Sequence, residues 1–179
     1  MGASQSTITV GNFDIGPAQV LFNGIDLGGT SGNVKIKFKY DKKPLSADQT
    51  GSKTALDFAV TGMECSVETM FQETRNKTNF AALFPSATVV TTSGHQYIDF
   101  KDQTALRQLQ YASPLQLHPL EEALSSNDYD WYFYKALPQE DSEYTFGPEQ
   151  QAKLKIHWTI LLDLTVTPGR MFRAGNHAL

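Results

Sequence analysis

The sequence has few of the features that anchor, cross-link or bind nucleic acid. Cys65 is the single cysteine, so no disulfide can form within the chain, which suits a reducing compartment. The sequence contains no run of about 18 apolar residues that could span a membrane. It also contains no basic segment followed by an apolar one that would indicate a secretory signal. Acidic residues outnumber basic ones 19 to 15. Since phosphate contacts need clustered lysines and arginines, we expect neither a membrane partner nor tight DNA binding.

Motifs for catalysis and for metal binding are also lacking. No H-x-x-x-H or H-E-x-x-H spacing links the histidines, and no G-x-S-x-G elbow is present. Cys65 follows Glu64, which gives no reason for a lowered thiol pKa. The acidic loop after residue 139 lacks the spacing of a calcium loop. We therefore expect a protein that is not an enzyme and holds no cofactor or metal.

The chain does contain regular alternation of apolar and polar residues. Apolar residues alternate with lysines over 34–40, and alternation resumes over 56–68, with a phase change at Gly62 that indicates a β-bulge. Between the two strands, residues 41–55 are polar and contain Pro44 and Gly51, which predicts a long loop. Because such loops usually carry function or are disordered, we expect this one to contact another copy of the chain.

The other predicted elements are mostly strands. Asn23-Gly24 and Ser93-Gly94 are turns typical of hairpins. Residues 76–84 predict the one helix, with Thr78 as N-cap and Pro85 as its stop. The 131–137 segment predicts an inner strand and 150–165 the longest strand, placed mid-sheet. Further strands are expected at 7–10, 18–22, 25–27, 87–92, 95–100, 106–112 and 115–120, although the leucines of 106–109 and the segment 120–124 also fit a helix.

These elements predict a single mainly β domain over residues 1–179, with two layers and one short flanking helix. Residues 1–16 and 166–179 are predicted as terminal arms. One alternative function is a monomeric sugar-binding β-sandwich, in which Trp131, Tyr132 and Tyr134 form a stacking platform. Packing in the core would use the same aromatic residues, so the sequence leaves this alternative open.

The parts of the chain follow one another in a definite order. A short hairpin ends in the turn sequence LGGTSGNV at 27–34, and an alternating strand follows. A long loop with Asp48-Gln49-Thr50-Gly51, a strand through Thr61-Gly62 and a helix closing in Leu83-Phe84-Pro85 come next, and a later aromatic strand ends in Lys135-Ala136-Leu137. This order resembles that of the tail tube, or major tail, proteins of long-tailed bacteriophages, and the resemblance covers about residues 20–164.

The resemblance implies a β-sandwich whose sheet edges pair with those of neighbouring copies and close into a barrel between subunits. It implies homohexameric rings that stack by helical assembly into a hollow tube, through which DNA passes without specific binding during genome ejection. The implied partners are further copies of the chain and other tail proteins such as terminator, tape measure and distal tail proteins. The implied location is the virion, with assembly in the host cytoplasm.

The resemblance also implies which residues make contacts between subunits. Lys35, Lys37 and Lys39 stay open to two interpretations: either Asp57, Glu64 and Glu68 offset their charge, or their face meets another subunit. The loop is expected to reach the adjacent ring through Lys42, Lys43, Pro44, Leu45, Asp48, Gln49 and Lys53. The arms are expected to contact neighbouring subunits through Thr7, Ile8, Val10, Phe13, Arg170, Met171 and Phe172.

Overall fold

The computed structural model describes residues 17–46, 54–102, 104–105, 107–139, 143–145 and 152–176. The predicted strand at 7–10 and the N-terminal arm lie outside these ranges, as does the middle of the predicted 41–55 loop. Within the described ranges, no helix is long and apolar enough to cross a membrane. The predicted contact residues outside the described ranges are Thr7, Ile8, Val10, Phe13, Asp48, Gln49 and Lys53.

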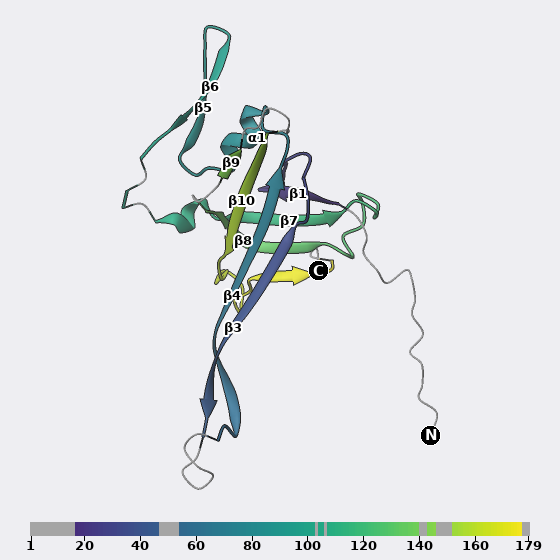
Figure 1. The fold of residues 1–179 in the computed structure, drawn as a ribbon, viewed down its shortest axis with the longest axis vertical. Helices are drawn as coiled ribbons and strands as arrows, with labels where there is room; N and C mark the ends of the chain where they lie inside the picture. The colour runs from purple at the N-terminus through teal and green to yellow at the C-terminus, as the bar shows by residue number, and fades with distance from the viewer. Residues whose placement is uncertain are drawn as a thin grey trace.

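Over the described residues the chain is mainly β, with antiparallel pairing throughout and one short α-helix, as predicted (Figure 1). The prediction of a strand at 106–112 was wrong for the described residues, because a 3₁₀ turn spans Gln108–Tyr111. The elements are β1 (Ala18–Phe22), β2 (Ile25–Asp26), β3 (Lys35–Leu45), β4 (Asp57–Phe71), α1 (Lys77–Ala82), β5 (Ala87–Thr92), β6 (His95–Phe100), β7 (Ser113–Pro119), β8 (Trp131–Pro138), β9 (Glu143–Thr145), β10 (Lys153–Ile160) and β11 (Phe172–Ala174).

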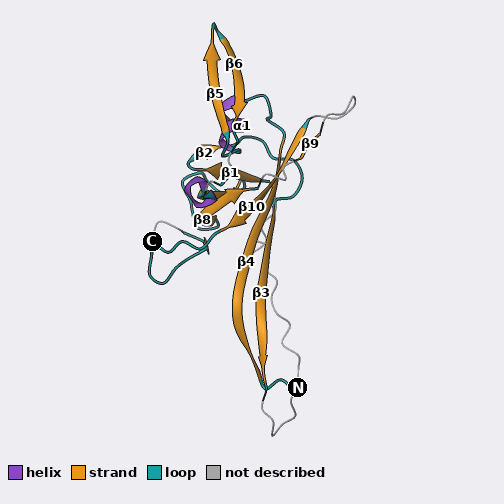
Figure 2. Cartoon of the chain, turned by 90° about the vertical axis from the view of Figure 1, so that its left-hand side faces the viewer, coloured by secondary structure: helices purple, strands orange, loops and turns teal. Residues whose placement is uncertain are grey.

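One large sheet forms the body of the protein. Its strand order is β2-β1-β7-β8-β10-β4-β3, with β11 beside β8 and β9 beside β10. The strands β7 and β8 run steeply across β10, β4 and β3, so the sheet folds over on itself into two layers (Figure 1). A separate hairpin, β5–β6, extends at the opposite end of the molecule from the β3–β4 hairpin (Figure 2).

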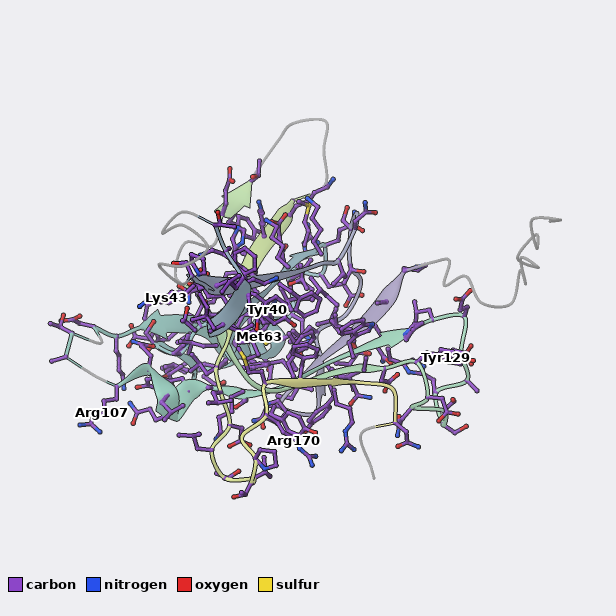
Figure 3. The ribbon with its side chains drawn as sticks, turned by 90° about the horizontal axis from the view of Figure 1, so that it is seen from below. Tyr40, Lys43, Met63, Arg107, Tyr129 and Arg170 are labelled. Atoms are coloured by element: carbon purple, nitrogen blue, oxygen red, sulfur yellow. The ribbon has the colours of Figure 1, made fainter. Side chains whose placement is uncertain are left out.

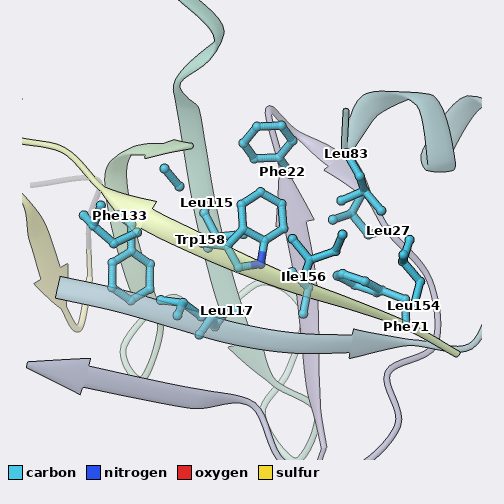
Figure 4. Close-up of a cluster of buried hydrophobic side chains, with 14 of the residues drawn as sticks. Phe22, Leu27, Phe71, Leu83, Leu115, Leu117, Phe133, Leu154, Ile156 and Trp158 are labelled. Atoms are coloured by element: carbon cyan, nitrogen blue, oxygen red, sulfur yellow. The ribbon is translucent and has the colours of Figure 1, made fainter. Parts of the chain in front are cut away.

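The core lies between these two layers and centres on Trp158 of β10 (Figure 4). Its ring is fully buried, lies 4.8 Å from the Phe22 ring of β1, and donates a hydrogen bond from Nε1 to Thr69 Oγ1 at 2.8 Å. Because β1 and β10 are not neighbours in the sheet, the Phe22 contact joins the two layers. The predicted mid-sheet place of β10, between β8 and β4, is confirmed.

The predicted extent of this strand was wrong at its C-terminal end, and the prediction that it is the longest strand was also wrong, because β4 and β3 are both longer. β10 ends at Ile160, and beyond it Leu162 and Leu164 are 49% and 77% exposed. The chain turns there because Asp163 pairs through its backbone with Arg170, and its carboxylate accepts hydrogen bonds from Thr165. Within the predicted 150–165 strand, only the apolar residues up to Ile160 therefore contribute to the core.

Helix α1 packs on the sheet as predicted, but its N-cap differs. The Asn76 side chain accepts hydrogen bonds from the backbone N–H groups of Thr78 and Asn79, so the prediction that Thr78 is the cap was wrong. An asparagine two positions earlier satisfies the free N–H groups of the first turn equally well. Leu83, just after the helix, is buried, and Phe80 packs against the core.

Strand β8 is an inner strand, as predicted, but contains a bulge. Ser113 pairs with Ala136, whereas Leu115 pairs with Phe133, so β8 has one extra residue between these positions. The extra residue shifts the alternation, and Ala136 joins Phe133 on the fully buried side. Without the bulge, simple alternation along 131–137 would place Ala136 on the same face as Tyr132 and Tyr134.

The C-terminal segment is part of the chain's own sheet. Phe172 of β11 pairs with Phe133 of β8, and Gly175 N donates to Asp130 O at 2.8 Å. β11 occupies the edge of β8 that β10 leaves free, because β10 pairs with β8 only from Ala136 onward. Residues 172–174 of the predicted C-terminal arm thus form a strand of the sheet, and the contacts of this arm with a neighbouring copy stay a prediction.

The variant Trp158→Ala is expected to lower the free energy of unfolding by about 3 to 5 kcal/mol, because it leaves a cavity where the two layers meet. The control Leu164→Ala, on the segment that was predicted to continue the same buried stripe, should cost less than about 0.5 kcal/mol. Chemical denaturation of both variants measures this. Equal costs would contradict the placement of the core.

Candidate assembly surface on the β3–β4 hairpin

The most unusual feature of the molecule is the long β3–β4 hairpin, which extends away from the sheet (Figures 1 and 2). β10 pairs with β4 only from Cys65 to Phe71, so beyond this stretch β3 and β4 pair only with each other among the described residues. The predicted loop at 41–55 was wrong for its first part, because Asp41–Leu45 pairs with Asp57–Gly62. Lys42, Lys43, Pro44 and Leu45 are thus strand residues.

The β-bulge predicted at Gly62 is confirmed. Asp41 pairs with Gly62, but Lys42 pairs with Val60, so β4 carries one extra residue at this point. Without it, every residue nearer the tip would change face, because side chains alternate with a period of two. The bulge keeps Phe58 and Val60 on the same face as Met63, Cys65 and Val67.

This face of the hairpin is buried in the core at its root and exposed to solvent at its tip. Val67 and Cys65 are 1% and 3% exposed, whereas Val60 and Phe58 are 59% and 57% exposed. On β3, the ring of Phe38 contacts the Phe172 ring at 5.0 Å, but Tyr40 is 52% exposed. We call the exposed residues Tyr40, Phe58 and Val60 the hairpin patch. A contiguous apolar patch of this kind marks an interaction site.

The opposite face carries the lysines, and acidic side chains of β4 partly offset them. Lys35 Nζ lies 3.4 Å from Glu68 Oε1, and Lys39 Nζ lies 3.2 Å from Glu64 Oε2. Among the described residues Asp57 pairs with none of these lysines, because it lies opposite Leu45 near the tip of the hairpin. The first of the two interpretations of these lysines is therefore confirmed for Glu64 and Glu68 and wrong for Asp57.

Glu68 is the centre of this charged face. Lys155 of β10 also reaches it, with Nζ 3.3 Å from Oε1. Burial raises the pKa of the Glu68 carboxyl, but hydrogen bonds from Lys155 and Lys35 outweigh burial and hold the pKa below its ordinary value. Nearer the tip, the hydrogen bond to Glu64 raises the pKa of Lys39. Lys42 and Lys43, nearer still, make no ion pair with any described residue.

A groove of about 650 Å³ lies at the root of the hairpin. Tyr40 and Met63 line it from the hairpin, and Arg170, Met171 and Phe172 line it from the C-terminal segment (Figure 3). The structure thus brings the predicted C-terminal contact residues next to the hairpin. Sequence reasoning did not select the hairpin patch as a site, although the alternation that continues through Val60 and Phe58 was the signal for it.

The remaining candidate sites find little support in the geometry. The described residues hold no group of three or more side chains suited to a metal ion. Burial raises the pKa of the Cys65 thiol to about 11, so the thiol is protonated at neutral pH. Trp131 packs on Phe172, whereas Tyr132 packs on Tyr134 on the other face of β8. The proposed platform of three aromatic residues is therefore not assembled.

No protein-family model matches the sequence, and a search of curated proteins also finds no match. The function therefore has to be inferred from the hairpin and its surroundings.

The double variant Phe58→Ser/Val60→Ser should change the free energy of unfolding by less than about 0.5 kcal/mol in a dilute sample, because both side chains are exposed. The matched control Val67→Ser, on the same face but buried, should cost about 2 to 4 kcal/mol. Urea denaturation measures both. A large cost for the double variant would mean that the chain itself covers the hairpin patch.

Glu68→Gln should remove part of the acid sensitivity of the fold. Since the folded-state pKa of Glu68 is lowered, its ion pairs stabilise the fold fully above the unfolded pKa of about 4.3. This contribution is lost as the pH falls through the folded-state pKa. Melting temperatures between pH 3 and 7 should therefore differ most at neutral pH and converge in acid. The control is Glu64→Gln, whose parent side chain is 67% exposed, so its effect should be smaller. Parallel curves for Glu68→Gln and the parent would contradict the assignment.

Proposed function

We propose that the chain is the tail tube subunit of a long-tailed bacteriophage. In this proposal, copies associate into hexameric rings, and the rings stack into the hollow tube through which DNA passes during genome ejection. The other partners are tail proteins such as terminator, tape measure and distal tail proteins, and the location is the virion. The antiparallel sheet, the single flanking helix and the order of the parts support the resemblance on which the proposal draws.

The observation that carries the proposal is the hairpin patch. The exposed tip continues a face that is buried at its root, so the sequence has the pattern of a core face where no described residue covers it. Burial of apolar surface contributes roughly 25 cal/mol per Å², and covering the hairpin patch with a second copy would recover this energy. Association would also pair the free edges of β3 and β4, which otherwise invite uncontrolled aggregation.

The charge of the chain fits a conduit. The net charge of −4 on each copy repels DNA, so a tube built from the chain would let DNA slide without adhering. Lys35, Lys37 and Lys39 of β3 are an exception to this balance, and their pairing with Glu64 and Glu68 reduces their attraction for phosphate. The proposal therefore needs no specific DNA contact.

The test is negative-stain electron microscopy of the purified full chain over a concentration series. The parent protein should form rings or hollow filaments. A hairpin-truncated variant, in which Asn-Gly joins Tyr40 directly to Met63, should fold but stay monomeric because it lacks the tip of the hairpin. These two residues are opposite partners in the ladder, so a two-residue turn can connect them.

The matched control shortens the other projecting hairpin. Joining Val90 to Tyr97 through Asn-Gly removes the tip of β5–β6, and these residues are also opposite partners. This control should still assemble. A parent protein that stays monomeric at high concentration would refute the proposed function, and a truncated β3–β4 variant that assembles normally would refute the role of the hairpin.

A further inference from the structure

A second surface of the molecule combines apolar and acidic side chains. It is the connection between β7 and β8, residues 120–130, and the sequence has no lysine or arginine between Arg107 and Lys135. Its leucines and tyrosine are about as exposed as the hairpin patch, with Leu120 52%, Leu124 75% and Tyr129 50% exposed. The exposed Asp128 and the half-buried Glu122 accompany them. We call these five residues the acidic patch.

The acidic patch is held in place at both ends. At its start, Leu120 N donates a hydrogen bond to Pro17 O at 3.0 Å. At its end, Asp130 is fully buried, and its carboxylate lies 2.7 Å from Nδ1 of the buried His118 on β7. A backbone turn between Ser126 and Ala123 shapes the middle. The connection therefore presents its side chains from a fixed framework.

The hairpin carries the complementary charge beside the hairpin patch. Lys42 and Lys43 are exposed, and neither makes an ion pair with a described residue. Lys42 pairs with Val60 and therefore lies on the same face as the hairpin patch, whereas Lys43 pairs with Ala59 and lies on the opposite face at the same level of the hairpin. Figure 3 shows that Lys43 and Tyr129 lie well apart on the molecule, so one copy cannot bring the two surfaces together.

We propose that the hairpin patch and its two lysines dock on the acidic patch of a second copy of the chain. This inference rests on the proposed function and names the surface that the hairpin meets. Each surface offers apolar side chains to bury and a charge of opposite sign, which steers association and disfavours other pairings. Contact between two hairpins would instead place Lys42 and Lys43 against the same lysines.

The symmetry of such a contact agrees with the proposed assembly. The two surfaces differ, so each copy has one hairpin free for a neighbour and one acidic patch free for another. Contacts of this heterologous kind generate closed rings or open helical filaments, whereas a self-complementary contact would end at a dimer. The docking of hairpin on acidic patch thus extends the association beyond two copies.

The test reverses the charge of each surface in turn in the full chain. Lys42→Glu/Lys43→Glu makes both surfaces of a copy acidic, and Glu122→Lys/Asp128→Lys makes both basic. Each variant alone should need at least about tenfold more protein to assemble than the parent, which corresponds to about 1.4 kcal/mol per contact. An equimolar mixture of the two should assemble near the parent concentration, because the acidic hairpin of one variant can dock on the reversed, basic patch of the other, and the basic hairpin on the acidic patch.

Light scattering over a concentration series measures this, and circular dichroism verifies that each variant is folded. The control Lys101→Glu/Arg107→Glu makes the same change in net charge away from both surfaces and should assemble like the parent. Single-surface variants that assemble normally would overturn the inference while leaving the proposed function in place. Rescue of Lys42→Glu/Lys43→Glu by the parent as fully as by Glu122→Lys/Asp128→Lys, which keeps the same basic hairpin, would show hairpin-to-hairpin contact and would also overturn it.

Discussion

The bulged pairing of β3 with β4 is the interaction on which the account depends. One extra residue at Gly62 restores the alternation, so a single face stays apolar from the buried Val67 to the exposed Phe58. Because the root of this face packs in the core, the hairpin has a fixed direction, and its tip carries apolar side chains away from the sheet (Figure 2). The same β3–β4 hairpin thus stabilises the domain at its root and exposes the hairpin patch at its tip.

Local signals in the sequence predicted much of the fold. The alternation over 34–40 and 56–68, the bulge at Gly62, and the turns at Asn23-Gly24 and Ser93-Gly94 all depend on neighbouring residues, and the structure has them. The start of the predicted loop was placed too early, because Lys42 and Lys43 are polar and Pro44 lacks a backbone N–H group. Both kinds of residue are tolerated on a strand whose outer edge is free.

Features that depend on distant residues could not be predicted in the same way. The return of β11 to β8 depends on where β10 leaves that strand, and the buried pair of His118 and Asp130 depends on the register of β7. The exposure of the Leu162 and Leu164 side chains could not be predicted either. Alternation predicts which face of a strand a side chain takes, but not whether another layer covers that face. The hairpin patch was overlooked as a site for this reason.

The proposed tube follows from a fold that is complete in its core but leaves one apolar face uncovered among the described residues. The most direct measurement of this claim is a cryo-electron microscopy reconstruction of the assembled full chain, at a resolution that shows side chains. The account predicts copies arranged around a channel, with Phe58 and Val60 buried against a neighbouring copy. An assembly in which these two side chains face open solvent would contradict it.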